Sequence, residues 1–165
     1  MSRPLEAGGS GGVQVRRATL EEIIDLRHAV LRQGLPRQAA IFPGDELATS
    51  RHYGALLQAA ASACIVGCAT LHLNQWEGQP AWQLRGMATA DGHRGQGLGR
   101  SLLVFIEKEI LTNASTPKRL WCNARVPAAG FYETLGWQIV SEQFDIPTAG
   151  PHVRMTRELK RDKCR

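Results

Sequence analysis

The sequence lacks the features of three large classes of protein. No apolar run approaches the roughly 18 residues that a transmembrane helix needs, so we expect no membrane partner. The glycine-rich segment 1–12 has no apolar stretch of the kind found in secretion signals, and we predict a flexible tail there. The four cysteines form no C-x-x-C pair and no zinc pattern. We therefore expect free thiols in a reducing cytoplasm and no metal site.

Aromatic residues are also scarce, at 6% of the chain, and they form no basic and aromatic stripe of the kind that stacks on RNA bases. The net charge is +5, of which residues 160–165 carry +3, so we predict a basic C-terminal tail there. Such a charge suits a polyanionic cofactor as well as nucleic acid. Nucleic-acid binding therefore ranks last among the functions considered.

What the chain does contain is one domain of alternating elements, predicted over residues 13–159. Strands are predicted over 13–17, 52–57, 63–74, 81–89, 119–124, 137–142 and 152–159, and helices over 20–33, over 101–111 and between Pro127 and Gly136. Turns or loops are predicted over 59–63, 74–80 and 143–151. The loop over 35–51 either lines a binding site or is an ordinary connection. Short connections indicate an antiparallel meander, and the middle helix favours one parallel strand pair.

The most distinctive stretch is a glycine-rich loop directly before an amphipathic helix. Gly95, Gly97 and Gly99 alternate there, and glycine permits positive φ and a close approach of a ligand to the backbone. The first N–H groups of a helix have no partner and the helix dipole is positive at that end, so this loop is a candidate phosphate site. Its spacing fits neither the P-loop nor the dinucleotide-binding pattern. The alternative interpretation is a glycine turn that caps a core helix.

The loop matches the pattern R-x-x-G-x-G over residues 94–99. This pattern resembles the pyrophosphate loop of the GNAT acyltransferase superfamily, and the preceding LRGMAT at 84–89 looks like that family's central strand. Residues 123–137, with Asn123, Tyr132 and Gly136 at the matching places, resemble the family's second motif. The predicted element order is similar to the GNAT fold over nearly the whole chain after residue 12. The segment 144–152 looks like that of a subset of small GNAT proteins with poorly defined acceptors.

The resemblance implies a fold and an activity. The fold would be α/β (α+β), with a mixed, mostly antiparallel sheet of about six to seven strands and helices on both faces. The activity would be N-acetyltransfer, in which acetyl-CoA or another acyl-CoA donates its acyl group to an amine of a small molecule or peptide. A homodimer is implied only by family habit.

The resemblance also assigns roles to residues. In the family the loop amides hold the pyrophosphate, which here implies Arg94, Gly95, Gln96, Gly97, Leu98, Gly99 and Arg100. A backbone N–H of the central strand polarises the thioester carbonyl, which implies Met87, Ala88 or Thr89. The second motif adds Asn123, which would bond the pantetheine arm, and Ala129. Tyr132 stands where the family commonly keeps a general acid that protonates the departing thiolate. The alternative for Tyr132 is a tyrosine that only packs its helix against the sheet. The alternative for Asn123 is a polar residue at the edge or end of a strand.

One position departs from the family pattern. Many members carry a glutamate on the central strand as the base, but residues 81–86 contain no carboxylate. The base is therefore unassigned, with Glu142, His152, His72 and Asp45 as candidates. Arg85 indicates an acidic acceptor or an arginine that orients the acceptor, unless it is a salt-bridged surface charge. The missing carboxylate also keeps open a non-catalytic acyl-CoA sensor or partner-binding module.

Overall fold

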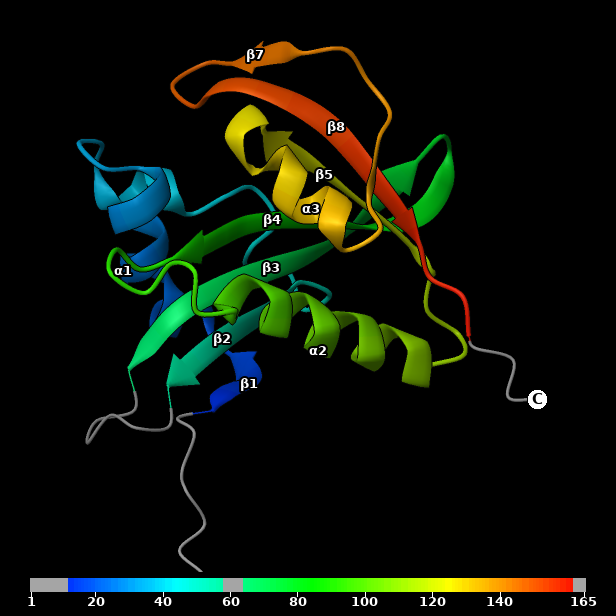
Figure 1. Cartoon of the computed structure of the whole chain (residues 1–165), viewed down its shortest axis with the longest axis horizontal. Helices are drawn as coiled ribbons and strands as arrows, with labels where there is room; N and C mark the ends of the chain where they lie inside the picture. The colour runs from blue at the N-terminus through cyan, green and yellow to red at the C-terminus, as the bar shows by residue number, and fades with distance from the viewer. Residues whose placement is uncertain (1–11, 58–63, 162–165) are drawn as a thin grey trace, which may run out of the picture.

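The computed structural model describes residues 12–57 and 64–161, which fold around one β-sheet (Figure 1). In chain order the elements are β1 (Val13–Ala18), α1 (Leu20–Leu31), the 3-10 helix η1 (Arg37–Ala40), β2 (Arg51–Leu57), β3 (Ile65–Trp76), β4 (Gln79–Thr89), α2 (Leu98–Thr112), β5 (Arg119–Arg125), η2 (Val126–Ala128), α3 (Ala129–Thr134), β6 (Gln138–Ile139), β7 (Phe144–Ile146) and β8 (Gly150–Glu158). The predicted N-terminal tail up to residue 11, the turn at 59–63 and residues 162–165 of the basic tail lie outside the described residues.

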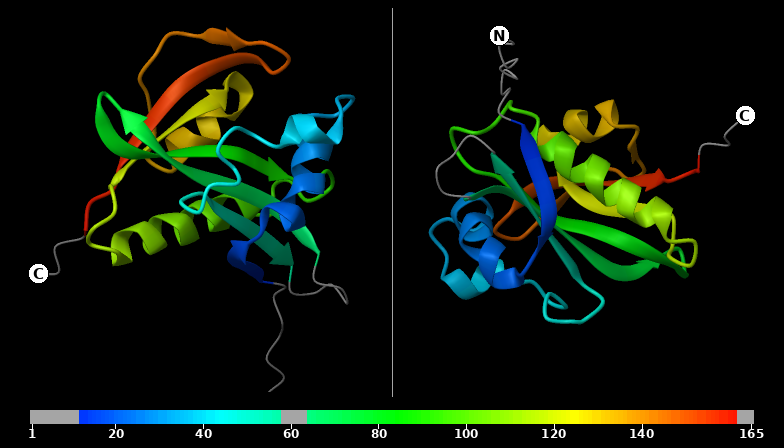
Figure 2. Two further views of the ribbon diagram at one scale, coloured as in Figure 1. Left: turned by 180° about the vertical axis from the view of Figure 1, so that it is seen from behind. Right: turned by 90° about the horizontal axis from the view of Figure 1, so that it is seen from below.

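The sheet is mixed and mostly antiparallel, as predicted. Within the described ranges it has eight strands in the order β1-β2-β3-β4-β5-β8-β6, with β7 paired to β8. The pairing of β4 with β5 is parallel, and α2 connects these two strands. Helices cover both faces, because α1 packs on one face and α2 and α3 on the other (Figure 2). The larger hydrophobic core lies under α2 and α3, and a smaller cluster lies under α1.

The two long helices form for reasons that are local to their sequences. At the start of α1, Thr19 accepts from the backbone N–H of Glu22 and the Glu22 carboxylate accepts from the N–H of Thr19, which confirms the predicted capping box. In α2, Leu102, Ile106 and Ile110 recur at helical spacing and are fully buried. The glycine loop before α2 is therefore attached to a rigid, core-packed element.

Three sequence predictions are wrong in detail. The predicted loop at 143–151 contains β7, because Phe144 pairs with His152 and Ile146 with Gly150 across a tight turn. In place of the predicted turn at 74–80, the turn is only two residues long, Glu77 and Gly78, which both take positive φ. The strands are longer than predicted, since β3 ends at Trp76 and β4 begins at Gln79. The predicted strand at 137–142 is only two residues long, Gln138–Ile139.

Two irregularities of β4 open a space in the middle of the sheet. Among the described residues, β4 pairs with β5 only at Trp82 and Gln83, so beyond residue 83 the β5-facing edge of β4 has no strand partner. The register with β3 shifts between residues 68 and 70, so that one β3 residue faces both Gly86 and Met87. Gly86 has φ +62°, which is the left-handed conformation of a glycine bulge. The candidate site lies beside this open edge and bulge.

Candidate functional site

The glycine loop and the start of α2 form one wall of a cavity of about 690 Å³, which we call the loop chamber. Gly95 and Gly97 both have φ near +77°, and Gly97 precedes α2 without a side-chain cap. The first backbone N–H groups of α2 therefore have no side-chain acceptor, which is the arrangement that binds phosphate oxygens. Gly99 has a different reason to be glycine, because a Cβ there would lie 3.0 Å from the Phe131 ring of α3.

The loop chamber collects most of the predicted cofactor residues. Its lining includes Met87, Ala88, Thr89, Arg94, Gly95, Gly97, Leu98, Gly99, Arg100 and Tyr132. Arg94 is exposed and pairs with Asp91 at 3.3 Å, so its charge is accessible at the mouth of the chamber. Gln96 and Ala129 do not line this chamber. Ala129 is instead buried in the core below α3.

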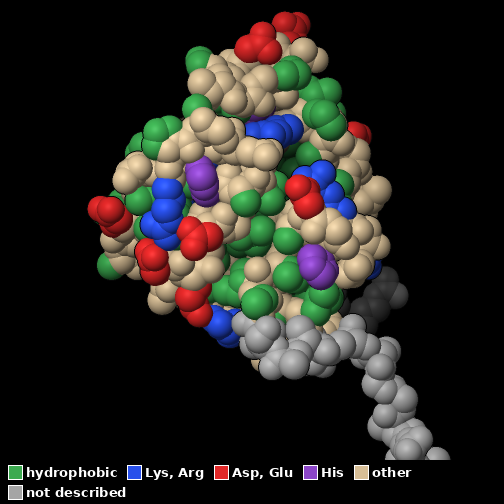
Figure 3. Space-filling model, turned by 90° about the vertical axis from the view of Figure 1, so that its left-hand side faces the viewer, with side chains coloured by type: hydrophobic (Ala, Val, Ile, Leu, Met, Phe, Trp, Pro, Cys, Tyr) green, Lys and Arg blue, Asp and Glu red, His purple; other side chains and the backbone are tan. Residues whose placement is uncertain are grey.

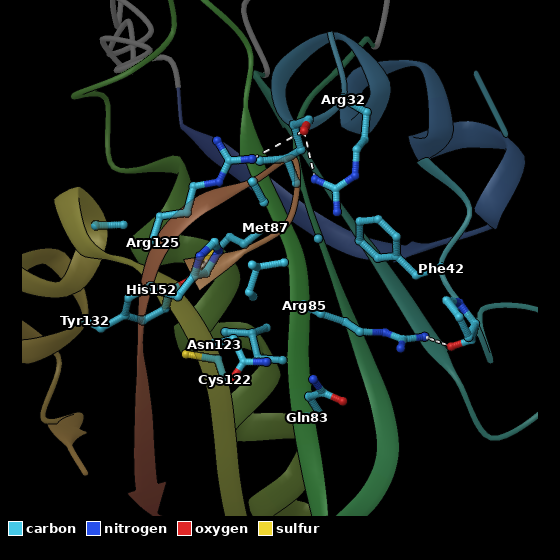
Figure 4. Close-up of a pocket in the computed structure, with 17 residues that line it drawn as sticks. Arg32, Phe42, Gln83, Arg85, Met87, Cys122, Asn123, Arg125, Tyr132 and His152 are labelled. Carbon is cyan, nitrogen blue, oxygen red and sulfur yellow. Dashed lines mark hydrogen bonds between the residues drawn. The ribbon is translucent and has the colours of Figure 1, made fainter. Parts of the chain in front are cut away.

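A second cavity, of about 320 Å³, lies on the other side of the β4 bulge. We call it the arginine chamber, after Arg32, Arg85 and Arg125 in its wall (Figure 4). Its wall is built from the end of α1, the segment after η1, β4, β5 and the β7–β8 hairpin. On the outer surface of this side, Lys or Arg side chains lie beside exposed apolar side chains (Figure 3). The two chambers meet, because five residues line both: Leu31, Met87, Arg125, Ala128 and Tyr132.

Tyr132 stands at the junction of the two chambers. Its ring packs edge-on against Phe131 and Trp137, and its hydroxyl donates only to the Met87 thioether, at 3.4 Å, among the described residues. A thioether sulfur is a weak acceptor, so the hydroxyl remains available to a stronger one. Burial, and then the neighbouring Cys122, raise the pKa of Tyr132 above its usual value of 10.0. The phenol is therefore protonated at neutral pH.

His152 is the one predicted base candidate that lines either chamber within the described part of the chain. Its Nδ1 lies 2.7 Å from the carbonyl oxygen of Gly150. Because a carbonyl only accepts, Nδ1 of the neutral ring carries the proton and Nε2 keeps the lone pair. Figure 4 shows the His152 ring facing the chamber close to Met87. Its Nε2 is thus the accepting nitrogen of the site.

The other three base candidates have different environments. The Asp45 carboxylate is fully buried and bound by Arg27 at 2.5 Å and by Arg85 at 3.2 Å. The ring of His72 contacts the Ser50 hydroxyl at 3.3 Å and lies outside the lining of both chambers. Glu142 is exposed in the connection between β6 and β7. None of these three side chains lines the two chambers.

A buried polar network supports the bulge from behind. Arg27 of α1 is fully buried and donates to Asp45, to the Ala40 carbonyl and to the Thr70 hydroxyl. A Cβ at Gly86 would lie 2.6 Å from Arg27 Nε, so only glycine fits above this guanidinium. The network therefore holds α1, the η1 segment and the bulged part of β4 together.

Some residues that line the arginine chamber were not predicted from the sequence. Arg32 and Arg125 lie in its wall. No motif indicated Arg32, and Arg125 lies within the second motif at 123–137 but received no role from it. Phe42 also lines this chamber, which fits one of the two interpretations of the 35–51 loop. Asn123 lines the arginine chamber rather than the loop chamber, and its side-chain oxygen accepts from Arg154 at 3.3 Å. Arg85 is not a surface charge, since its side chain is only 16% exposed.

Cys122 contributes a thiol to the described lining of the arginine chamber. Burial raises the pKa of the Cys122 thiol to about 12, so this cysteine of the arginine chamber is protonated and a poor nucleophile. No group of three His, Cys, Asp or Glu side chains in residues 12–57 and 64–161 is placed to hold a metal ion. Across the same ranges, every helix is too short or too polar to span a bilayer.

Comparisons with known proteins agree on one family. A family model described as "Acetyltransferase (GNAT) family" matches residues 20–137. The chain is 30% identical over 154 residues to "Uncharacterized N-acetyltransferase YitI" of Bacillus subtilis (strain 168), which covers 90% of this chain and 97% of that protein. The crystal structure of Escherichia coli ElaA superposes with a TM-score of 0.69 at 21% identity, over 89% of this chain and 100% of that chain. An aminoglycoside 6'-N-acetyltransferase complexed with coenzyme A superposes with a TM-score of 0.67 at 14% identity, over 91% and 99% of the two chains.

Proposed function

Since the chain belongs to the GNAT acetyltransferase family, we propose that it transfers the acetyl group of acetyl-CoA to an amine of a small molecule or peptide. One observation carries this proposal beyond the family assignment. The loop chamber, which contains the candidate phosphate loop, and a second, smaller chamber meet at Tyr132 and Met87, beside the open edge of β4. Two reactants that enter from opposite sides would thus meet at one point, and orientation of bound reactants is itself a large source of rate.

The loop chamber would hold the CoA moiety. The N–H groups around Gly95 and Gly97 and the unpartnered N–H groups of α2 would bind the diphosphate. Arg94 and Arg100 would add charge-assisted contacts at the mouth. The related fold of an aminoglycoside acetyltransferase is known in complex with CoA, which supports this choice of cofactor.

The thioester would lie along the open edge of β4. Among the described residues this edge has no strand partner beyond residue 83, so the backbone N–H of Met87 or Thr89 would be available to the thioester oxygen. The N–H of Ala88 faces β3 instead, because it alternates with Thr89 and shares the direction of the Ala90 N–H, which donates to the Val66 carbonyl. A donor aimed at that oxygen stabilises the negative charge that develops on it during attack. The amine nitrogen attacks the carbonyl carbon directly, the C–S bond breaks, and CoA leaves as a thiolate. The protonated state of Cys122 fits direct transfer without an enzyme-bound intermediate.

Two proton transfers complete the reaction. Tyr132 would donate its phenolic proton to the departing thiolate, because its hydroxyl lacks a strong partner and is protonated at neutral pH. His152 Nε2 would take a proton from the amine, directly or through water. The proton that the amine loses balances the one that the thiolate gains.

The test combines binding and turnover. Titration of the protein with CoA should show saturable binding, and thiol release from acetyl-CoA should depend on an added amine from a broad panel. Absence of saturable CoA binding would refute the proposal.

The alternative is a non-catalytic acyl-CoA sensor. It is favoured by the absence of a carboxylate among the described residues that line either chamber, since a carboxylate often serves as the base. Saturable CoA binding without thiol release on any amine would support the sensor, whereas amine-dependent release would exclude it.

A further inference from the structure

The arginine chamber has an excess of positive charge. Its wall carries Arg32, Arg85 and Arg125, and no carboxylate appears among its described lining residues. Arg85 shares the Asp45 carboxylate with the buried Arg27, so one negative charge faces two guanidinium groups. Arg32 and Arg125 form no ion pair within the described ranges of the chain. The positive charge in this wall is therefore not balanced by the residues that the structure describes.

Neutral groups help to hold all three guanidinium groups in place, and Arg85 is also bound by the Asp45 carboxylate. Arg32 Nη1 and Arg125 Nη2 both donate to the Leu31 carbonyl, at 2.8 and 3.3 Å (Figure 4). Arg85 Nη2 donates to the Pro43 carbonyl at 2.6 Å.

The Phe42 ring lies against two of these arginines. Its centroid is 4.9 Å from Arg32 Cζ and 5.9 Å from Arg85 Cζ. Carbonyls and an aromatic face orient a guanidinium but do not neutralise its charge. The buried Nε of Arg85 has no hydrogen-bond partner among residues 12–57 and 64–161.

The arrangement favours a bound anion on physical grounds. Burial first, and then the charge of Arg125, lower the pKa of Arg32, and burial lowers that of Arg85. These shifts mean that the charged forms are disfavoured by their surroundings. A bound carboxylate would offset this repulsion and would find planar donors already oriented for it.

We propose that the arginine chamber binds a carboxylate of the acceptor, so that the substrate is a small amine that carries an acidic group, such as an amino acid. This inference rests on the proposed acetyltransferase function and narrows its acceptor class. The volume of about 320 Å³ suits a small molecule. Tyr132 and His152 line the same chamber, so an amine close to a carboxylate held there would lie beside the proton-transfer groups.

Arg32 and Arg85 separate this anion site from the diphosphate site, whereas Arg125 lines both chambers. Arg32 and Arg85 line the arginine chamber but not the loop chamber. The loop chamber, but not the arginine chamber, is lined by Arg94, Gly95 and Gly97. Changes at Arg32 should therefore affect the acceptor and leave the cofactor unaffected.

The experiment compares amino acids with their carboxamides, which keep the shape and lose the negative charge. Initial rates of thiol release are measured at saturating acetyl-CoA. The amine of a carboxamide is less basic and is more often neutral at pH 7.5, so this comparison favours the carboxamide if charge is not recognised. We expect kcat/KM to be at least about tenfold higher for the best amino acid than for its carboxamide, as expected for charge-assisted hydrogen bonds.

Variants then test which residues are responsible. Arg32→Gln should lower kcat/KM for amino acids about tenfold or more and change that for carboxamides by less than about threefold, with an unaltered KM for acetyl-CoA. Arg85→Gln should act in the same direction and is accompanied by an unfolding curve, because Arg85 also pairs with Asp45. Arg119→Gln is the matched control, since Arg119 lies on the same strand as Arg125 but pairs with Glu158 at 2.7 Å and lines neither chamber.

The outcomes distinguish failure of the carboxylate site from failure of the acetyltransferase function. Equal acetylation of amino acids and carboxamides would overturn the carboxylate site while leaving the acetyltransferase function intact. An aminoalkyl phosphate that outperforms every amino acid would overturn the choice of carboxylate. If CoA binds but no amine is acetylated, the acetyltransferase proposal fails. The anion site is then judged by calorimetric titration of N-acetyl amino acids into the CoA complex: tighter binding by wild type than by Arg32→Gln supports it, and no binding overturns it.

Discussion

At the scale of single residues, Tyr132 differs from the other tyrosine of the chain in the partner of its hydroxyl. Tyr53 donates to the Glu109 carboxylate at 2.9 Å and lines neither chamber. Tyr132 donates only to a thioether among the described residues and faces the junction of two chambers. The first tyrosine is thus fully engaged in the fold, whereas the second keeps a donor for a ligand.

We predict that Tyr132→Phe lowers kcat by about 10²-fold, because the departing thiolate loses its proton donor. The KM for acetyl-CoA should change by less than about threefold, since the ring that packs against Phe131 and Trp137 is retained. Steady-state thiol release with the best acceptor measures both constants.

Tyr53→Phe is the matched control for this prediction. It removes one hydroxyl with a firm partner and should cost about 1 kcal/mol of stability without a change in kcat. An unchanged kcat in Tyr132→Phe would remove Tyr132 from the mechanism.

At the scale of elements, the glycine loop and α2 act as one unit. The loop residue Gly97 has φ +78°, and a Cβ added there would meet no atom within 4 Å apart from those of the adjacent residues, so a small side chain would meet backbone strain but no steric clash. Asparagine and aspartate tolerate this left-handed conformation better than other residues. They have nearly the same shape, so a pair of variants at Gly97 separates charge from geometry.

We predict that Gly97→Asp weakens CoA binding at least about tenfold relative to Gly97→Asn, because a carboxylate at the start of α2 occupies the anion site and repels the diphosphate. Isothermal titration with CoA gives both constants. A carboxylate at a helix N-terminus stabilises the helix, so weaker binding by the aspartate variant would not result from unfolding. Equal affinity of the two variants would mean that the diphosphate does not bind at this loop.

The sequence was informative where an element depends on its own residues. The capping box at Thr19, the buried stripe of α2 and the glycine loop are set by neighbours within a few positions, and all three could be predicted. The strand β7 could not, because Phe144 to Ile146 become a strand only by pairing with β8. The local pattern there, with Pro147 and Gly150, indicates a loop.

In the candidate site, too, features set by neighbouring residues were predicted, whereas features set by the packing of distant segments were not. One wall of the loop chamber is a continuous segment, Arg94 to Arg100 without Gln96, and the sequence singled out this segment by its glycine pattern. The arginine chamber brings Arg32 at the end of α1 next to Arg125 at the end of β5, where both donate to the Leu31 carbonyl. The local sequence around Arg32 or Arg125 does not predict that these two side chains lie close together, because their proximity depends on the packing of α1 beside the open edge of β4.

At the scale of the whole molecule, one hydrogen-bonded network joins four segments behind the site. Arg27 of α1 donates to Asp45 and to the Thr70 hydroxyl of β3. Thr70 lies 2.8 Å from Nδ1 of His52 in β2, and His52 Nε2 lies 3.0 Å from the Asp45 carbonyl. Because that carbonyl only accepts, the neutral His52 ring carries its proton on Nε2 and accepts from Thr70 at Nδ1. The network is complete when His52 is neutral.

Because of this network, the stability of the fold should depend on pH independently of the catalysed reaction. Burial first, and then the nearby positive charges of Arg27 and Arg85, lower the pKa of His52 below its usual 6.5, although Asp45 acts in the opposite direction. The unfolded chain therefore binds a proton at His52 over a pH range in which the folded protein does not. The stabilisation is fully present above pH 6.5 and is lost as the pH falls from 6.5 towards the lower pKa of the folded state.

We predict that the free energy of unfolding decreases between pH 7.5 and pH 5.5, with a slope from His52 of at most about 1.4 kcal/mol per pH unit. Urea unfolding at several pH values measures this slope. His72, whose pKa burial also lowers, contributes in the same direction, so His52→Gln and His72→Gln should each flatten the curve and the double variant should flatten it most. If His52→Gln retained the full wild-type slope, the buried network would not be the origin of the pH dependence, and the wall of the arginine chamber would have to be stabilised by other contacts.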